Sequence, residues 1–150
     1  MQVKMFMQKN VIKINENKSI IEASMILMKH KITGAPVIDN TNNLVGVISE
    51  KDIFKTIYPR YQEYYFLKSE DDNGDKLESR IKEAEDIKVK EVMTKNVIKA
   101  KSTDSAIKVA ALMLIKKINR VIILENNSLV GIVSRKDIFP QSFKSAMENK

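Results

Sequence analysis

The sequence predicts an α/β protein of mixed α+β type, built from two tandem β-α-β-β-α repeats. The first observation is a run of residues that occurs twice, since Leu44–Phe54 returns with three substitutions as Leu129–Phe139. The second is that the repeat extends upstream, so residues 7–54 align with 93–139 with Asn42 as the single insertion. The third is that both repeats show the same order of strand-like and helix-like hydrophobic patterns.

The first strand and first helix of each repeat follow from these patterns. Val11–Ile14 and Val97–Ala100 have the short alternating pattern typical of strands. Ser19 is the expected cap of the first helix, and Gly34 marks its end. The residues expected to face inward from this helix are Ile20, Ala23, Leu27 and Met28.

The equivalent helix of the second repeat is expected to run to about Lys117, with Thr103 or Asp104 as its cap. The residues expected to be buried along it are Ile107, Ala111, Leu114 and Ile118.

Each repeat ends with two strands and a second helix. The strand pairs are 35–38 with 44–48, and 121–124 with 129–133. Polar residues 39–43 and 125–128 between them are typical of hairpin turns. Ser49 and Ser134 end the last strands and open the final helices.

The repeats divide the chain into a first domain of residues 1–57 and a second of 91–150, joined by a connector at 58–90. Within the connector, Tyr58–Leu67 is rich in aromatic residues, which favours packing or a dimer contact over a ligand platform. Residues 70–75 are expected to form a loop, and 76–87 are compatible with a helix.

Composition excludes several classes of protein. The chain has 0 Cys and 1 His, which argues against disulfides, thiolate zinc sites and histidine-based metal or acid–base chemistry. The absence of Cys fits a reducing cytoplasm, which is the expected location. No apolar run is long enough to cross a bilayer. The net charge of +7 comes mostly from scattered Lys, which makes nucleic acid binding a weaker alternative. No catalytic motif is present, so we do not expect an enzyme.

The informative spacing is Ser-x-x-Asp where a strand passes into a helix, as Ser49 with Asp52 and Ser134 with Asp137. The free N–H groups of a helix start suit a phosphate, and a serine hydroxyl adds a donor. A carboxylate one turn along accepts the two hydroxyls of a ribose. These parts together describe a ribonucleotide site. The alternative is that the serines are simply N-caps and the aspartates stabilise the helix dipole.

The chain resembles a pair of cystathionine-β-synthase (CBS) domains, also called a Bateman module. In the first repeat the matching segments are Ile32–Asp39 and Gly46–Ile53. In the second they are 92–98, 118–124 and 131–138. This resemblance implies two halves packed about a pseudo-twofold axis, with two clefts that take AMP, ADP, ATP or S-adenosylmethionine.

The resemblance also implies roles for particular residues. Asp52 and Asp137 would accept the ribose hydroxyls, and Ser49 and Ser134 would contact ribose or phosphate. Thr94 and Arg120 lie where some family members have phosphate contacts. Lys51 and Lys136 either support phosphates or are ordinary surface lysines. The apolar residues expected around adenine are Val11, Ile12 and Pro36 in one cleft, and Val97, Ile98 and Ile122 in the other.

The repeats differ at these positions. The first has Gln8 opposite Thr94 and Gly34 opposite Arg120, so it lacks the guanidinium that grips phosphate. We therefore expect the Asp137 cleft to bind a phosphorylated nucleotide more tightly. The Asp52 cleft is expected to be empty or to prefer a less charged ligand.

The expected function is a non-enzymatic regulatory module with no required cofactor or metal, which binds an adenine nucleotide and signals through a shift between conformations. The resemblance implies a homodimer, with an unidentified regulated protein as a further partner. The alternatives are a structural dimerisation module without a ligand, and a sensor of S-adenosylmethionine or a cyclic dinucleotide.

Overall fold

The computed structural model describes residues 1–58, 65 and 74–149, which divide into two compact units. Unit 1 contains Met1–Val11 and Val97–Lys150, and unit 2 contains Ile12–Asn96. Each unit has a three-stranded sheet, which confirms the mixed α/β class. The units do not coincide with the repeats, because the start of each repeat packs with the other repeat's sheet.

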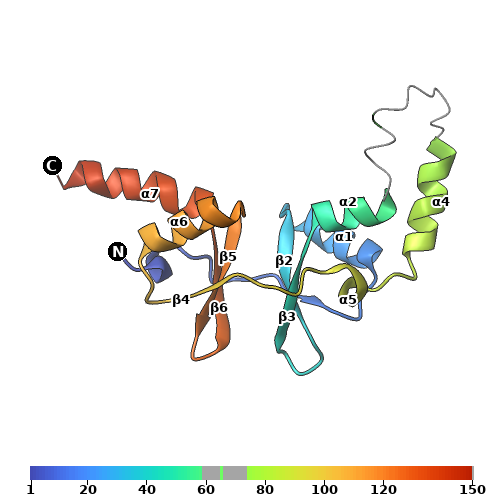
Figure 1. Ribbon diagram of the computed structural model, residues 1–150, viewed down its shortest axis with the longest axis horizontal. Helices are drawn as coiled ribbons and strands as arrows, with labels where there is room; N and C mark the ends of the chain where they lie inside the picture. Colours follow the sequence, from blue (N-terminus) through green and yellow to red (C-terminus); the bar gives the residue numbers. More distant parts are fainter. Residues whose placement is uncertain (59–64, 66–73, 150) are drawn as a thin grey trace. The chain divides into compact units, whose positions relative to one another are not determined.

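Unit 1 is built on the sheet order β4-β5-β6 (Figure 1). Strand β4 (Lys99–Lys101) runs parallel to β5 (Arg120–Glu125), and β5 forms an antiparallel hairpin with β6 (Ser128–Ser134). Helix α6 (Ala106–Lys116) connects β4 to β5, and α7 (Arg135–Glu148) follows β6. The short 3-10 helix η1 (Val3–Met5) belongs to the N-terminal segment.

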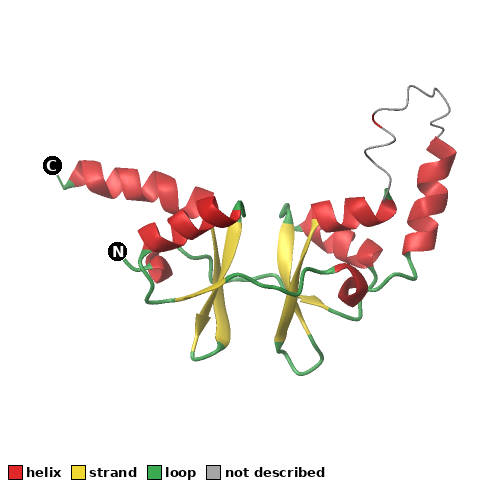
Figure 2. Ribbon diagram, in the orientation of Figure 1, coloured by secondary structure: helices red, strands yellow, loops and turns green. Residues whose placement is uncertain are grey.

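Unit 2 repeats this plan with the order β1-β2-β3. The strands are β1 (Ile14–Asn15), β2 (Gly34–Ile38) and β3 (Leu44–Ser49), and the matching helices are α1 (Ile20–Lys29) and α2 (Glu50–Ile57). The connector adds α4 (Gly74–Ala84) and the single-turn helix α5 (Val89–Val92). Within each unit the helices lie on one side of the sheet (Figure 2).

A proline explains why β1 is shorter than β4. In unit 1, Lys99 pairs with Ile122, whose N–H donates to the Ile98 carbonyl at 3.4 Å. The matching residue in unit 2 is Pro36, which has no N–H to donate. The parallel ladder of unit 2 therefore starts only at Ile14.

The N-terminal segment is an integral part of unit 1. Its backbone forms hydrogen bonds with the second repeat at several points. One of them is donated by the Val3 N–H to the Asp104 carbonyl oxygen at 2.8 Å. Gln8 and Ile132 exchange both backbone hydrogen bonds, at 2.8 and 3.0 Å. Val3 and Phe6 are buried in the core of this unit. The first repeat thus supplies a segment to the sheet of the second.

The start of the second repeat makes the reciprocal contact in unit 2. Val89 is fully buried, and its N–H donates to the Lys18 carbonyl at 2.8 Å. Thr94 and Val47 exchange both backbone bonds, each at 2.9 Å. Thr94 therefore has the same relation to β3 that Gln8 has to β6.

Gly46 and Gly131 lie where these crossing segments meet the sheets. A Cβ on Gly46 would lie 2.9 Å from the Thr94 carbonyl oxygen, and one on Gly131 would lie 3.0 Å from that of Gln8. The sulfur atoms of Met93 and Met7 would be closer still, at 2.7 and 2.5 Å. Glycine is required here because the chain crosses at backbone contact distance.

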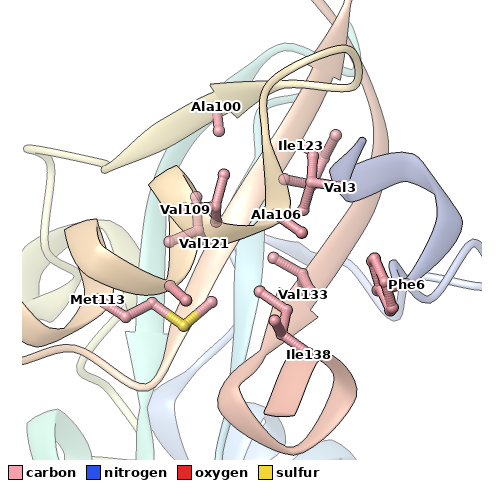
Figure 3. Packing of buried hydrophobic residues seen from close by; sticks show 11 residues of the cluster. Val3, Phe6, Ala100, Ala106, Val109, Met113, Val121, Ile123, Val133 and Ile138 are labelled. Carbon is pink, nitrogen blue, oxygen red and sulfur yellow. The ribbon is translucent and has the colours of Figure 1, made fainter. Parts of the chain in front are cut away.

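The core of unit 1 lies between the helices and one face of the sheet (Figure 3). Val121 and Ile123 occupy alternate positions of β5, so both side chains point from the same face of the sheet into this core, where Met113 of α6 packs with them. Phe6 closes the core from the N-terminal segment. Unit 2 has a separate core, which consists of Ile14, Ile20, Ala23, Leu27, Ala35, Val37, Ile48, Ile53, Ala84 and Val89.

The prediction for the face of α6 was wrong at Ile107, Ala111 and Leu114, which are exposed, whereas Ile118, just after the helix, is partly buried and packs against the core. Ile107 and Leu114 are 78% and 57% exposed. The buried residues are Ala106, Val109, Ala110 and Met113. This helix is apolar nearly all round, so its periodicity does not identify one face. Alignment with α1 does, because Ala106, Val109 and Met113 correspond to the buried residues Ile20, Ala23 and Leu27.

Two smaller expectations also need correction. Met28 is 64% exposed and does not face the core, although Ile20, Ala23 and Leu27 do. The N-cap of α6 is Ser105, not Thr103 or Asp104. The Asp104 carboxylate instead accepts the Lys101 N–H at 2.8 Å, which stabilises the turn before the helix.

The hairpins and part of the connector agree with the sequence. Asn126 and Asn127 adopt positive φ of 51° and 63° between β5 and β6, and the inserted Asn42 has a φ of 67° between β2 and β3. Helix α4 begins at Gly74, before the expected residue 76. The Tyr58–Leu67 segment lies mostly outside the described residues, but Tyr58 packs against Phe54 and beneath the Arg80 guanidinium.

Candidate functional site

Each unit has one aspartate at the third position of the helix that follows its hairpin. Ser49 and Ser134 have extended backbones and act as the N-cap residues of α2 and α7. Asp52 and Asp137 follow three residues later and are partly buried. The two aspartates therefore occupy equivalent positions, one in each unit.

In unit 2 the serine and aspartate form a capping box. The Ser49 N–H donates to Asp52 Oδ2 at 3.1 Å, and the Asp52 N–H donates to Ser49 Oγ at 3.1 Å. Among the residues that the structure describes, no donor contacts Asp52 Oδ1. The capping role therefore occupies one carboxylate oxygen and leaves the other able to accept hydrogen bonds.

In unit 1 the same carboxylate has more partners. Asp137 Oδ2 accepts from the Ser134 N–H at 2.7 Å and from Ser134 Oγ at 2.9 Å. Asp137 Oδ1 accepts from the side-chain amide of Gln8 at 3.1 Å. Both oxygens are thus engaged, and the serine hydroxyl points at its own helix's carboxylate.

The strand partners of the two serines differ in charge. Arg120 lies directly across the ladder from Ser134, whereas Gly34 lies across from Ser49. The residue after the serine is Arg135 in unit 1 and Glu50 in unit 2. Because Lys51 and Lys136 are both exposed, they add the same charge to each unit. Unit 1 is therefore the more cationic of the two at this turn.

Thr94 belongs to unit 2, where its backbone pairs with β3. Gln8 takes the corresponding place in unit 1, where its backbone pairs with β6. The leading segment of each repeat thus packs with the sheet of the other repeat, which the repeat alignment alone does not reveal. The role of Thr94 as a phosphate contact remains a prediction.

The apolar residues expected around adenine are also divided between the units. Val11, Val97, Ile98 and Ile122 belong to unit 1, and Ile12 and Pro36 belong to unit 2. Pro36 and Ile122 occupy equivalent places in β2 and β5 and are both buried. Val11, Ile12, Val97 and Ile98 are partly exposed. Val11 thus lies in the same unit as Asp137, and the roles of these residues around adenine remain predictions.

Gln8 is the residue that sequence reasoning missed. It was noted only because it stands opposite Thr94 in the alignment, and an exposed glutamine carries no motif of its own. The available signal was Gly131, since a glycine at the same position of both repeats indicates a close backbone crossing. Over the described ranges, 1–58, 65 and 74–149, no acidic or histidine cluster could hold a metal ion.

Within the same ranges, no helix is both long and apolar enough to cross a membrane.

Comparison with known proteins identifies relatives of the chain. The family model of the CBS domain matches residues 3–59 and 89–141. The protein MJ1426 of Methanocaldococcus jannaschii is 34% identical over 152 residues, which cover 92% of this chain and 89% of that protein. Other curated relatives are longer: the chain spans 24% of a homoserine O-acetyltransferase from Methanococcus vannielii, at 31% identity.

Solved structures have the same fold. The CBS domain pair of protein MJ0100, in complex with 5-methylthioadenosine and S-adenosyl-L-methionine, has a TM-score of 0.72 and 29% identity. The match covers 97% of this chain and 98% of that one. The CBS-pair protein CBSX2 from Arabidopsis thaliana has a TM-score of 0.77 at 23% identity, with coverage of 97% and 96%.

Proposed function

Because the chain belongs to the CBS domain family, we propose that it is a non-enzymatic regulatory module that binds adenosine-containing ligands through Asp52 and Asp137. AMP, ADP and ATP are the ligands of first choice. The MJ0100 pair, at 29% identity, was solved with S-adenosyl-L-methionine and 5-methylthioadenosine, which makes these the second candidates.

The observation that carries the proposal is the arrangement of the Asp52 carboxylate. Its Oδ2 is held by the Ser49 N–H, which fixes the orientation of the group. No donor among the described residues contacts its Oδ1, and the side chain is only partly buried. A carboxylate fixed in this way is pre-organised to accept the two hydroxyl donors of a ribose.

The charges near each aspartate support different preferences in the two units. Arg120 lies across the ladder from Ser134, and Arg135 follows Ser134 in the sequence. The guanidinium group of Arg is well suited to binding phosphate. Unit 2 has Gly34 and Glu50 at the same places. Unit 1 is therefore the proposed site for a phosphorylated nucleotide, and unit 2 for a less charged adenosine ligand.

Signalling would require a partner surface, and both units expose apolar side chains at matching positions. Phe54 on α2 and Phe139 on α7 are aligned in the repeats and are exposed. Met28 on α1 and Leu114 on α6 are a second exposed pair. These faces are the proposed contact of a homodimer and of the regulated protein, and ligand binding would shift the population of their arrangements. Size measurement in solution, with Phe139→Ser as the disrupting variant, tests the dimer.

Calorimetry with AMP, ATP and S-adenosylmethionine tests the ligand proposal. Asp52→Asn keeps an acceptor for the Ser49 N–H but removes the charge, so the cap should persist while ribose binding weakens. The expected loss is about 1.5–3 kcal/mol, or roughly tenfold to hundredfold in Kd. Glu50→Gln is the matched control, because it removes one negative charge from the same turn. No binding of any adenosine ligand would contradict the proposal.

A further inference from the structure

The Asp137 carboxylate accepts one hydrogen bond from the N-terminal segment that has no counterpart at Asp52 within the part of the chain that the structure describes. Gln8 donates its side-chain amide to Asp137 Oδ1 at 3.1 Å. In unit 2 the corresponding residue, Thr94, has an exposed side chain that makes no hydrogen bond to Asp52 among the described residues. The carboxylate of unit 1 therefore has an internal donor at the oxygen that is open in unit 2.

The position of Gln8 is fixed by its backbone rather than by its side chain. Its N–H and carbonyl both pair with Ile132, and the neighbouring Val3 and Phe6 are buried in the core. Gly131 admits this segment at close range. The side chain of Gln8 is exposed, so it can rotate away without disturbing the segment that carries it.

We propose that Gln8 is a specificity-determining residue that competes with ligand hydroxyls for Asp137, so that unit 1 binds a ribose only when the Gln8 amide is displaced. This inference rests on the proposed function, since it assumes that Asp137 accepts ribose hydroxyls. In the free protein the Gln8 amide donates to Asp137 Oδ1, the oxygen that would otherwise accept a ribose hydroxyl. Binding at unit 1 therefore exchanges one hydrogen bond for another, whereas binding at unit 2 adds a new one.

Because of this competition, ligand binding at unit 1 depends on contacts to parts of the ligand other than the ribose. A neutral nucleoside gains little at Asp137 because the bond it forms replaces an existing one. A phosphorylated nucleotide can draw on the cationic side chains around Ser134 instead. Gln8 would thus give the two units different affinities for the same nucleoside, although both have the same Ser-x-x-Asp spacing.

The test is a site-resolved titration by nuclear magnetic resonance with adenosine, AMP and 2′,3′-dideoxyadenosine. The chain has only 4 glycines, and the amide signals of Gly46 and Gly131 report unit 2 and unit 1 separately. Gln8→Ala and Gln8→Thr keep the backbone pairing with Ile132. Both variants are expected to raise the affinity of unit 1 for adenosine and AMP by roughly fivefold to tenfold, the factor for one hydrogen bond.

Two controls separate competition from a structural effect. The dideoxy ligand has no hydroxyl to exchange with Gln8, so its affinity for unit 1 should not change in either variant. Thr94→Gln should weaken adenosine binding at unit 2 by a similar factor, because it installs the competing amide there.

The outcomes distinguish the two proposals. Unchanged or weaker adenosine binding at Gly131 in Gln8→Ala, with binding at Gly46 intact, would overturn the competition and leave the proposed function standing. An equal gain for the dideoxy ligand would overturn it too. Failure of both glycine signals to respond to any ligand in any variant would overturn the proposed function and this inference together.

Discussion

The two units have the same fold and the same Ser-x-x-Asp turn, but their carboxylates are in different states. Asp137 accepts three hydrogen bonds from Ser134 and Gln8, whereas Asp52 accepts one from Ser49 among the described residues. One of the two additional bonds comes from the Ser134 hydroxyl, and the other comes from the segment that crosses the sheet, which supplies Gln8 in unit 1 and Thr94 at the aligned position in unit 2. A duplicated scaffold can thus place equivalent carboxylates in unlike surroundings through a residue that the other repeat supplies.

The largest expected effect tests whether the crossing segments belong to the cores they enter. Phe6→Ala should destabilise unit 1 by about 3–5 kcal/mol, because it removes a buried aromatic ring. Val92→Ala, at the aligned position in unit 2, should cost only about 1 kcal/mol, since a smaller and partly exposed side chain is trimmed. Amide hydrogen exchange at Ile123 and Val37 reports the two units, and equal losses in both variants would contradict this asymmetry.

The glycines at the crossings test whether both segments approach equally closely. Gly46→Ala and Gly131→Ala should each destabilise their own unit by about 1–3 kcal/mol, because the added Cβ would overlap the crossing backbone and a methionine sulfur. Chemical denaturation of the two variants measures this loss. In Gly131→Ala the Gln8 amide should also move away from Asp137, which its side-chain proton signals would reveal. A neutral substitution at either glycine would mean that the segment can relax without cost.

A proline in β5 should shorten the parallel ladder of unit 1 in the way that Pro36 shortens the ladder of unit 2. Ile122→Pro removes the N–H that bonds to the Ile98 carbonyl, and we expect a cost of about 1 kcal/mol with β4 shortened as β1 is. Ile122→Val is the control, since it keeps the N–H. Cross-strand nuclear Overhauser contacts between Lys99 and Ile122 measure the ladder, and their persistence in the proline variant would refute the explanation.

The smallest expected effect concerns the hairpin of unit 2. The Asn43 backbone N–H, followed by the Thr41 hydroxyl, lowers the pKa of the Asp39 carboxyl below its ordinary value. A lowered native pKa means that this stabilisation is present above the unfolded pKa and is lost as pH falls through the native one. Carboxyl titration by nuclear magnetic resonance should show the low pKa, and Asp39→Asn should abolish this pH dependence. An Asp39 pKa at or above its ordinary value would contradict the assignment.

The sequence predicted the elements well because the repeat provided two independent readings of each one. It did not identify the buried face of α6, because an almost wholly apolar helix gives no periodic signal. The alignment with α1 carries that information instead. The sequence also did not reveal that Met1–Val11 packs with the second repeat and residues 88–96 with the first, because this crossing is a long-range event. The same limitation hid the contact between Gln8 and Asp137, which are far apart in the chain and share no motif.

The most direct test of the account is a crystal structure of the protein with adenosine bound. The account predicts that the ribose hydroxyl oxygens lie at hydrogen-bond distance, about 3 Å, from the Asp52 carboxylate while its bond to the Ser49 N–H persists. Adenosine bound elsewhere, with the Asp52 carboxylate touching no part of the ribose, would contradict it.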